Sequence, residues 1–205
     1  MDYGFKDLKD PNAYNPERSK QLLAEDGWKD TDGDGILDKD GKPLTFNFVV
    51  YNSRAELPLY AEAVQADLKK VGIDMKIKTV DYNLIDKMGQ DGDYDMLISN
   101  IVTANTGDPI WFLANYWHTN IDGSNPQNGS GYSNPQVDQL LDAAETEFDP
   151  AKRRDYAIQI QQLLMNDGAA LFLGYPKTNI VTGSYLKGAV MYPSDYYWIT
   201  NKISK

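Results

Sequence analysis

The sequence has no cysteine among its 205 residues and one histidine, His118. The lack of cysteine excludes disulfides, thiolate nucleophiles, zinc ribbons and iron–sulfur clusters. A single histidine leaves zinc without its usual ligands, and no Gly-x-Ser-x-Gly motif offers a serine nucleophile. We therefore expect His118 to be a solvent-facing or hydrogen-bonded structural residue and the chain to have no catalytic residues.

Long hydrophobic runs are also missing. The most apolar stretches, 96–104 and 169–175, are far shorter than the roughly 20 residues that a membrane span needs. Residues 1–6 lack the order of a signal peptide, so we expect any export signal to lie outside this sequence. Neither a dinucleotide-binding glycine motif nor a Walker loop is present, which excludes the commonest nucleotide-binding chemistry.

Positive charge is scarce, because 20 basic side chains face 30 acidic ones and leave a formal charge of −10. Such a chain is repelled by phosphates, so we expect no nucleic-acid partner, and we expect no direct membrane insertion. The hydrophobic share of 41% and the charged share of 24% are typical of a globular protein. At this length, folding buries roughly 70% of the unfolded surface, which is enough for a core without staples.

Helix starts are marked by four Asn-Pro or Asp-Pro pairs, because the first residue caps the helix and proline is preset for its first turn. A further helix is indicated by apolar residues that recur every three or four positions before Gly72. The expected helices span 16–26, 57–71, 135–147 and 150–167. The pair at 108–109 is a candidate start for the aromatic segment 111–117.

Strands are expected at 44–51 and 74–80, on either side of the 57–71 helix. This order predicts a β-α-β unit with a right-handed crossover. Segments 94–100 and 169–175 are interpreted as further buried strands, and 120–133 as one surface loop. The pattern predicts an α/β fold with a mixed sheet flanked by helices.

The segment 30–38 alternates aspartate with other residues and contains two glycines, which is the spacing of a calcium-binding loop. Gly41 stands where an EF-hand places its bidentate glutamate, and the chain then enters a strand rather than a helix. Two interpretations stay open: a structural calcium ion, or an acidic hairpin whose aspartates serve turn geometry. The candidate metal ligands are Asp30, Asp32, Asp34, the Ile36 carbonyl and Asp38.

Several segments stand out in order along the chain: 15–28, 40–44, 68–73, 92–96, 108–109, 131–141 and 152–154. Taken together, they resemble the C-terminal lobe of the oligopeptide, dipeptide and nickel solute-binding proteins of ABC transporters, known as solute-binding protein family 5. The resemblance covers most of the chain and implies one lobe of a type II periplasmic-binding-protein-like fold. Residues 1–205 would form the C-terminal ligand-binding lobe, with the N-terminal lobe absent.

The resemblance implies an extracytoplasmic, non-enzymatic protein that captures short peptides between two lobes and delivers them to ABC transporter permease subunits. Such a protein is periplasmic or lies at the cell surface, anchored, as a lipoprotein, through the missing N-terminal region. We expect no required cofactor; a structural calcium ion is the one candidate, as considered above. Peptides in this family lie extended between the lobes and bind through their main chain.

The resemblance also places the ligand along 101–109. Peptide-binding members often have an aspartate four residues before the proline, where it pairs with the ligand's amino terminus. Here that position is Asn105, which accepts a hydrogen bond but does not neutralise an ammonium. Asp108 is either a substitute or simply the cap of the helix that follows. The expected ligand contacts are Ile101, Thr103, Asn105, Asp108 and Trp111.

Two other classes of function stay open. A secreted hydrolase acting on peptides or glycans is the first, because 30 acidic residues offer many carboxylate pairs. A calcium-stabilised adhesion or scaffold module is the second, suggested by the acidic loop.

Overall fold

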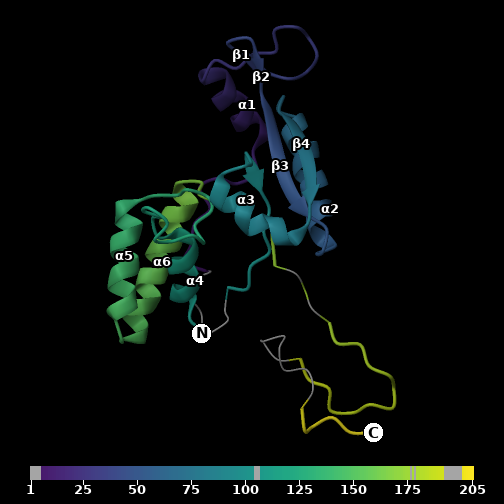
Figure 1. Cartoon of the computed structure of the whole chain (residues 1–205), viewed down its shortest axis with the longest axis vertical. Helices are drawn as coiled ribbons and strands as arrows, with labels where there is room; N and C mark the ends of the chain where they lie inside the picture. Colours follow the sequence, from purple (N-terminus) through teal and green to yellow (C-terminus); the bar gives the residue numbers. More distant parts are fainter. Residues whose placement is uncertain (1–5, 104–106, 176, 178, 192–199) are drawn as a thin grey trace. The chain divides into compact units, whose positions relative to one another are not determined.

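The computed structural model describes residues 6–103, 107–175, 177, 179–191 and 200–205 (Figure 1). The chain divides into two compact units, Met1–Leu171 and Phe172–Lys205. In the second unit, Lys187 and Ser204 form an antiparallel bridge. The expectation that 1–205 forms a single lobe stays a prediction.

A three-stranded parallel sheet forms the α/β part of the first unit, with β3 in the centre. Its order is β4-β3-β5, and β3 pairs with β4 over seven residues. Val49 and Val50 of β3 are fully buried, as expected for a central strand rich in β-branched and aromatic residues. The strands are β3 (Thr45–Tyr51), β4 (Asp74–Val80) and β5 (Met96–Leu97).

The prediction of an α/β architecture is confirmed. The main sheet was expected to be mixed, but all of its described strands are parallel. The described antiparallel pairing consists of the hairpin β1 (Asp38–Lys39) and β2 (Lys42–Pro43) and of two isolated bridges, Lys29–Asp38 and Lys187–Ser204. The strand expected at 94–100 is shorter than predicted. Hydrogen bonds from the N–H groups of Asp95 and Ile98 to β3 extend its pairing beyond each end.

Helix α2 (Glu56–Lys69) connects β3 to β4, as predicted, and buries Leu57 and Ala61. Gly72, with φ of +83°, follows the helix, and a Cβ atom there would lie 2.6 Å from Leu37 Cγ. Glycine is therefore required at this position both by backbone conformation and by space. The next connection holds the short helices η1 (Tyr82–Leu84) and α3 (Ile85–Asp91), which no sequence pattern predicted.

Helix α1 (Pro16–Glu25) starts where predicted, because the Asn15 side chain accepts the Arg18 N–H at 3.0 Å. After it, the chain returns through Trp28 to the hairpin. A small core forms beside this region from Leu44, Val71 and Ile73, with Leu23, Trp28, Leu37, Phe46 and Leu68 packed around it.

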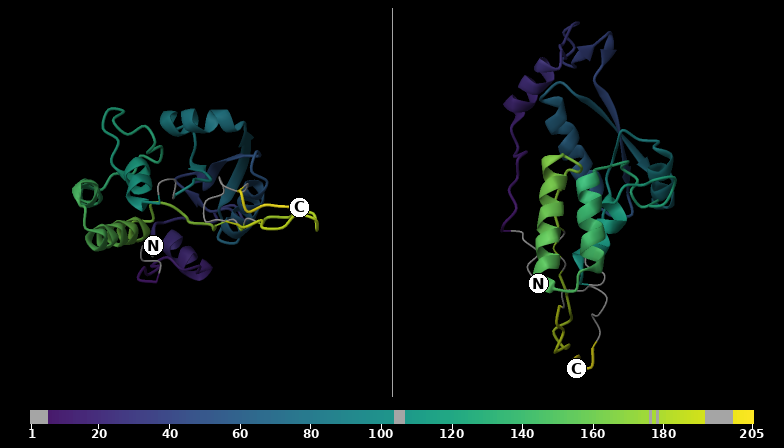
Figure 2. Two further views of the ribbon diagram at one scale, coloured as in Figure 1. Left: turned by 90° about the horizontal axis from the view of Figure 1, so that it is seen from below. Right: turned by 90° about the vertical axis from the view of Figure 1, so that its left-hand side faces the viewer.

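Three helices share a second core (Figure 2): α4 (Pro109–Trp117), α5 (Pro135–Thr146) and α6 (Pro150–Asn166). All three begin at the predicted proline, and α5 and α6 lie side by side. The core contains Ile110, Leu113, Trp117, Val137, Leu141, Ala144, Ala157, Ile160 and Leu164.

The prediction of a strand at 169–175 is wrong. This segment is irregular, and the side chains of Leu171 and Tyr175 are 66% and 83% exposed. An apolar run forms a strand only when a neighbouring strand takes up its backbone hydrogen bonds. Among the described residues, no strand pairs with this segment. The loop at 120–133 is confirmed. Within the described ranges, no helix is long and apolar enough to cross a membrane.

Candidate ligand-binding site

The order of the sheet creates a point where the direction of the connections reverses. From β3 the chain moves to β4 on one side, and from β4 it returns across β3 to β5 on the other. In open parallel sheets, ligands bind outside the carboxyl ends of the strands at such a point. The segments that leave β3 and β5 at this edge are 52–55 and 98–103. The second contains Ile101 and Thr103, both predicted to contact the ligand.

Hydrogen bonds join the second segment to the residues on either side of the first. The Asn100 backbone N–H donates to Tyr51 Oη at 3.0 Å, and the Asn100 amide Nδ2 donates to Glu56 Oε1 at 3.1 Å. Tyr51 is the last residue of β3 and is only 1% exposed, while Glu56 is the first residue of α2. The end of the central strand, the start of its helix and the segment after β5 are therefore held together.

Aromatic side chains lie next to this edge. The rings of Tyr51 and Tyr82 meet edge to face, with centroids 5.1 Å apart, and Tyr82 remains 56% exposed. On α4, Phe112 and Tyr116 have ring centroids 5.2 Å apart. Burial raises the pKa of Tyr116, and the charges of Asp86 and Tyr82 add to the rise. Tyr116 therefore stays neutral at physiological pH.

Asp108 has a clear structural role. One carboxylate oxygen accepts the Ile110 N–H at 3.0 Å and caps α4, and the other accepts a hydrogen bond from the Arg153 guanidinium. Arg153 also donates to the carbonyl oxygens of Ala144 and Glu147. The capping interpretation of Asp108 is confirmed, and its charge is already paired with a cation of α6.

The other predicted ligand contacts lie in different settings. Ile101 and Thr103 are half-buried, whereas Trp111 is 41% exposed on α4. Asn105 lies outside the described residues. Their roles in ligand binding stay predictions. The contact of Tyr51, Glu56 and Asn100 was missed, and its only sequence signal is that each residue stands at a strand or helix end.

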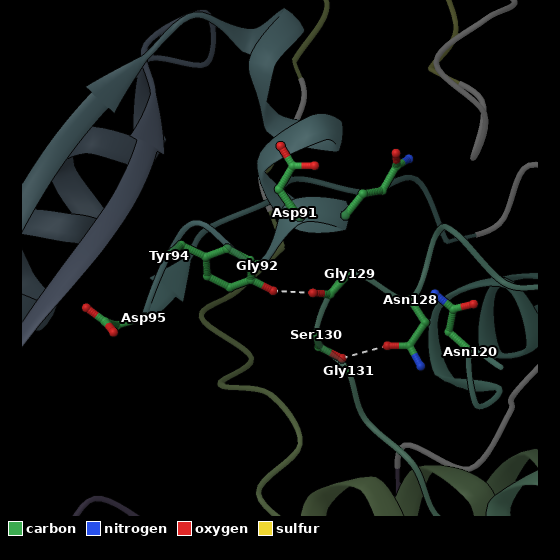
Figure 3. A pocket seen from close by; sticks show the side chains of 11 residues that line it. Asp91, Gly92, Tyr94, Asp95, Asn120, Asn128, Gly129, Ser130 and Gly131 are labelled. Carbon is green, nitrogen blue, oxygen red and sulfur yellow. Dashed lines mark hydrogen bonds between the residues drawn. The ribbon is translucent and has the colours of Figure 1, made fainter. Parts of the chain in front are cut away.

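A cavity of about 420 Å³ lies between the end of α3 and the loop 120–131 (Figure 3). Its wall is held by a hydrogen bond from Tyr94 Oη to the Gly129 carbonyl oxygen. A Cβ atom on Gly129 would lie 3.2 Å from Gly89 Cα, so two backbones meet closely here. Asp95, which also lines the cavity, precedes β5 and so marks the amino end of that strand. The cavity is therefore distinct from the carboxyl edge.

Comparison with known proteins decides the family. Residues 1–124 match the sequence model of the family described as Bacterial extracellular solute-binding proteins, family 5 Middle. The match covers more than half of the chain. The chain belongs to family 5. The predicted resemblance is thereby confirmed.

Relatives of this family 5 chain include the oligopeptide-binding protein AppA of Bacillus subtilis, which is 31% identical over 196 residues, 92% of this chain and 34% of AppA. The solved structure of AppA in complex with a nonapeptide has a TM-score of 0.69 and 30% identity, and the match covers 80% of this chain and 32% of that one. NikA from Brucella suis in complex with Fe(III)-EDTA has a TM-score of 0.69 and 27% identity over 82% of this chain and 33% of NikA.

These matches confirm the predicted type II periplasmic-binding-protein-like fold. They also show that the family 5 chain spans about a third of the length of these relatives.

The acidic loop brings together three of the five predicted metal ligands. Carboxylate oxygens of Asp30, Asp32 and Asp38 lie within 4.8 Å of one another. Asp30 accepts the Gly33 N–H at 2.7 Å and the Gly35 N–H at 3.1 Å, which are bonds of a tight acidic turn.

Asp34 is not part of that group. Its carboxylate accepts the Ile36 N–H at 2.7 Å. Calcium prefers six to eight oxygen ligands, and three carboxylates supply part of that set. The calcium interpretation therefore stays a prediction.

His118 ends α4 and faces α5. Its Nε2 lies 3.3 Å from Asp142 Oδ1, and its Nδ1 lies 3.7 Å from Asp138 Oδ1. Burial lowers the pKa of His118, but the Thr119 carbonyl and the two carboxylates outweigh it and raise the pKa above its usual value. These contacts agree with the structural role predicted for this histidine.

Proposed function

We propose that this chain is the C-terminal ligand-binding part of an extracytoplasmic solute-binding protein of an ABC importer, and that its ligand is a short peptide. One observation carries the peptide assignment: the similarity to AppA, whose solved complex holds a nonapeptide. Because the chain spans about a third of the length of AppA, the activity of the whole protein is part of the proposal.

The peptide lies at the carboxyl edge of the sheet. β5 is the edge strand of the described sheet, and 98–103 follows it. An extended peptide beside such a segment forms main-chain hydrogen bonds that do not depend on its sequence. Two exposed apolar side chains offer contact area for varied peptide side chains: Val102 in this segment and Tyr82, whose ring contacts that of Tyr51. Affinity then comes mainly from the main chain, which suits import of mixed peptides.

The rest of the protein completes the site. A second lobe closes over the ligand and buries it from both sides, and the closed form is recognised by the permease subunits. The family is described as extracellular, and we propose that a lipid-modified N-terminal region anchors the protein at the cell surface. The protein binds its ligand without chemical change, so no residue acts as a catalyst.

Mass spectrometry of ligands released from the purified full-length protein tests this function. We expect a mixture of short peptides. Turnover of added peptides or glycans would favour a hydrolase instead, and calcium-dependent capture of another protein would favour a scaffold module. Either result would contradict the proposal.

A metal chelate is the second candidate ligand, because NikA from Brucella suis is solved with Fe(III)-EDTA and matches most of this chain. The sequence has one histidine, His118, and its two ring nitrogens contact the Thr119 carbonyl oxygen and the Asp142 carboxylate. A metal ion would therefore compete with these contacts for the ring nitrogens of His118. If elemental analysis detects a chelated metal among the released ligands, the ligand is a metal chelate rather than a peptide.

A further inference from the structure

Glu56 is a half-buried carboxylate at the carboxyl edge of the sheet. Its one hydrogen-bond partner among the described residues is the Asn100 amide, at 3.1 Å. Arg54, two residues earlier, makes no ion pair with it: within the described ranges, the ion pairs of arginine join Arg18, Arg153 and Arg154 to other acids. A partly desolvated carboxylate with a single neutral partner retains unused acceptor positions and an unbalanced charge.

The other acidic groups near this edge differ from Glu56. Asp108 caps α4 and pairs with Arg153. Asp81, just after β4, accepts the backbone and side-chain N–H groups of Asn83 at 2.8 and 2.7 Å, both at one carboxylate oxygen, and is exposed to solvent. Asp86 is exposed as well. Among these carboxylates, Glu56 is therefore the half-buried one that makes no ion pair.

The surroundings of Glu56 fix its position before any ligand arrives. Asn100 is held by its N–H bond to Tyr51 Oη, and Tyr51 is buried in the sheet. Glu56 occupies the first turn of α2, where the helix dipole favours a negative charge. Because the Asn100 Nδ2 donates to Glu56, the Asn100 amide oxygen is left as a second acceptor close by.

We propose that Glu56, positioned by Asn100, is the specificity-determining residue that pairs with the free amino terminus of the bound peptide. An ammonium has three donors and no acceptor, which matches a carboxylate beside an amide oxygen. This inference rests on the proposed peptide-binding function. It assigns to Glu56 the charge that neutral Asn105 does not supply.

The test uses the full-length protein and a synthetic mixture of short peptides that lack lysine, arginine and histidine, half of them N-acetylated. Immobilised protein captures peptides from the mixture, and mass spectrometry gives the ratio of free to acetylated forms. We expect the wild type to prefer the free amine by about tenfold to a hundredfold, as for a hydrogen bond to a charged group. Glu56→Gln should bring the ratio to about one.

Glu62→Gln is the matched control, because Glu62 is an exposed carboxylate further along the same helix. It should keep the wild-type ratio. The glutamine of Glu56→Gln still offers an oxygen to the Asn100 amide, so the fold is preserved, and a circular dichroism melt checks this.

The outcomes separate two failures. Peptide capture without preference for the free amine, or an unchanged preference in Glu56→Gln, would overturn the role of Glu56 and leave peptide binding intact. Capture of no peptide by the wild type would overturn the proposed function, and the role of Glu56 with it.

Discussion

At the residue scale, His118 couples the end of α4 to the carboxylates of Asp138 and Asp142 on α5. Its pKa is raised above the usual 6.5 in the folded state, so the protonated form stabilises the fold. By linkage, this contribution is fully present below pH 6.5 and is lost as the pH rises through the folded-state pKa.

His118→Asn removes that contribution. We expect the difference in unfolding free energy between wild type and variant to be largest below pH 6.5 and to shrink in alkaline solution. Urea unfolding at a series of pH values measures it. A difference that stays constant with pH, or grows as the pH rises, would show that the histidine is not stabilised in its charged form.

The acidic loop gives a second prediction at this scale. If the loop binds calcium only in the folded state, calcium stabilises the protein and raises its melting temperature. At a calcium concentration one hundred times Kd, the unfolding free energy should rise by about 2.7 kcal/mol. Replacing Asp32 and Asp34 together by asparagine should abolish the response, whereas Asp40→Asn, just outside the candidate ligands, should keep it. An unchanged calcium response in the double variant would show that the loop is an acidic hairpin.

At the element scale, the helices were predicted well because their starts are encoded locally. Asn15, Asp108, Asn134 and Asp149 each accept a backbone N–H at the start of a helix whose first residue is proline. These interactions lie within a few residues of one another and need no tertiary contact.

Elements that depend on contacts with residues far away in the sequence were predicted less well. The apolar run 169–175 was interpreted as a strand, but pairing, not composition, decides strand formation. α3 was missed because it is short, with Gly89 inside it, and its residues Ile85 and Met88 are buried only by tertiary packing. The cluster of Tyr51, Glu56 and Asn100 was missed for the same reason, since it depends on β3 and β5 pairing in register.

The cap of α6 provides the prediction at this scale. Asp149 Oδ1 accepts the N–H groups of Ala151 at 2.8 Å and Lys152 at 3.3 Å. Asp149→Ala should lower the unfolding free energy by about 1 kcal/mol, and Asp149→Ser should restore most of it. Urea denaturation measures both. Equal stability of the alanine and wild-type proteins would contradict a role of this cap in stability.

At the scale of the whole molecule, the proposed function gives this chain one side of a ligand site. Closure buries a ligand between two surfaces, and about two thirds of the length of AppA lies outside the match. The 205-residue chain alone should therefore bind short peptides at least about tenfold more weakly than the full-length protein, because the contacts of the second surface are lost. Isothermal titration calorimetry compares the two. Equal affinities would show that the second lobe adds nothing to binding.

We propose that peptide binds at the carboxyl edge of the sheet. Hydrogen exchange of the full-length protein, with and without a saturating mixture of short peptides, tests this placement. We expect slower exchange in 98–103 on peptide addition and unchanged exchange in 89–95 and 120–131, which border the cavity in Figure 3. Protection confined to the cavity segments, with 98–103 unaffected, would contradict it.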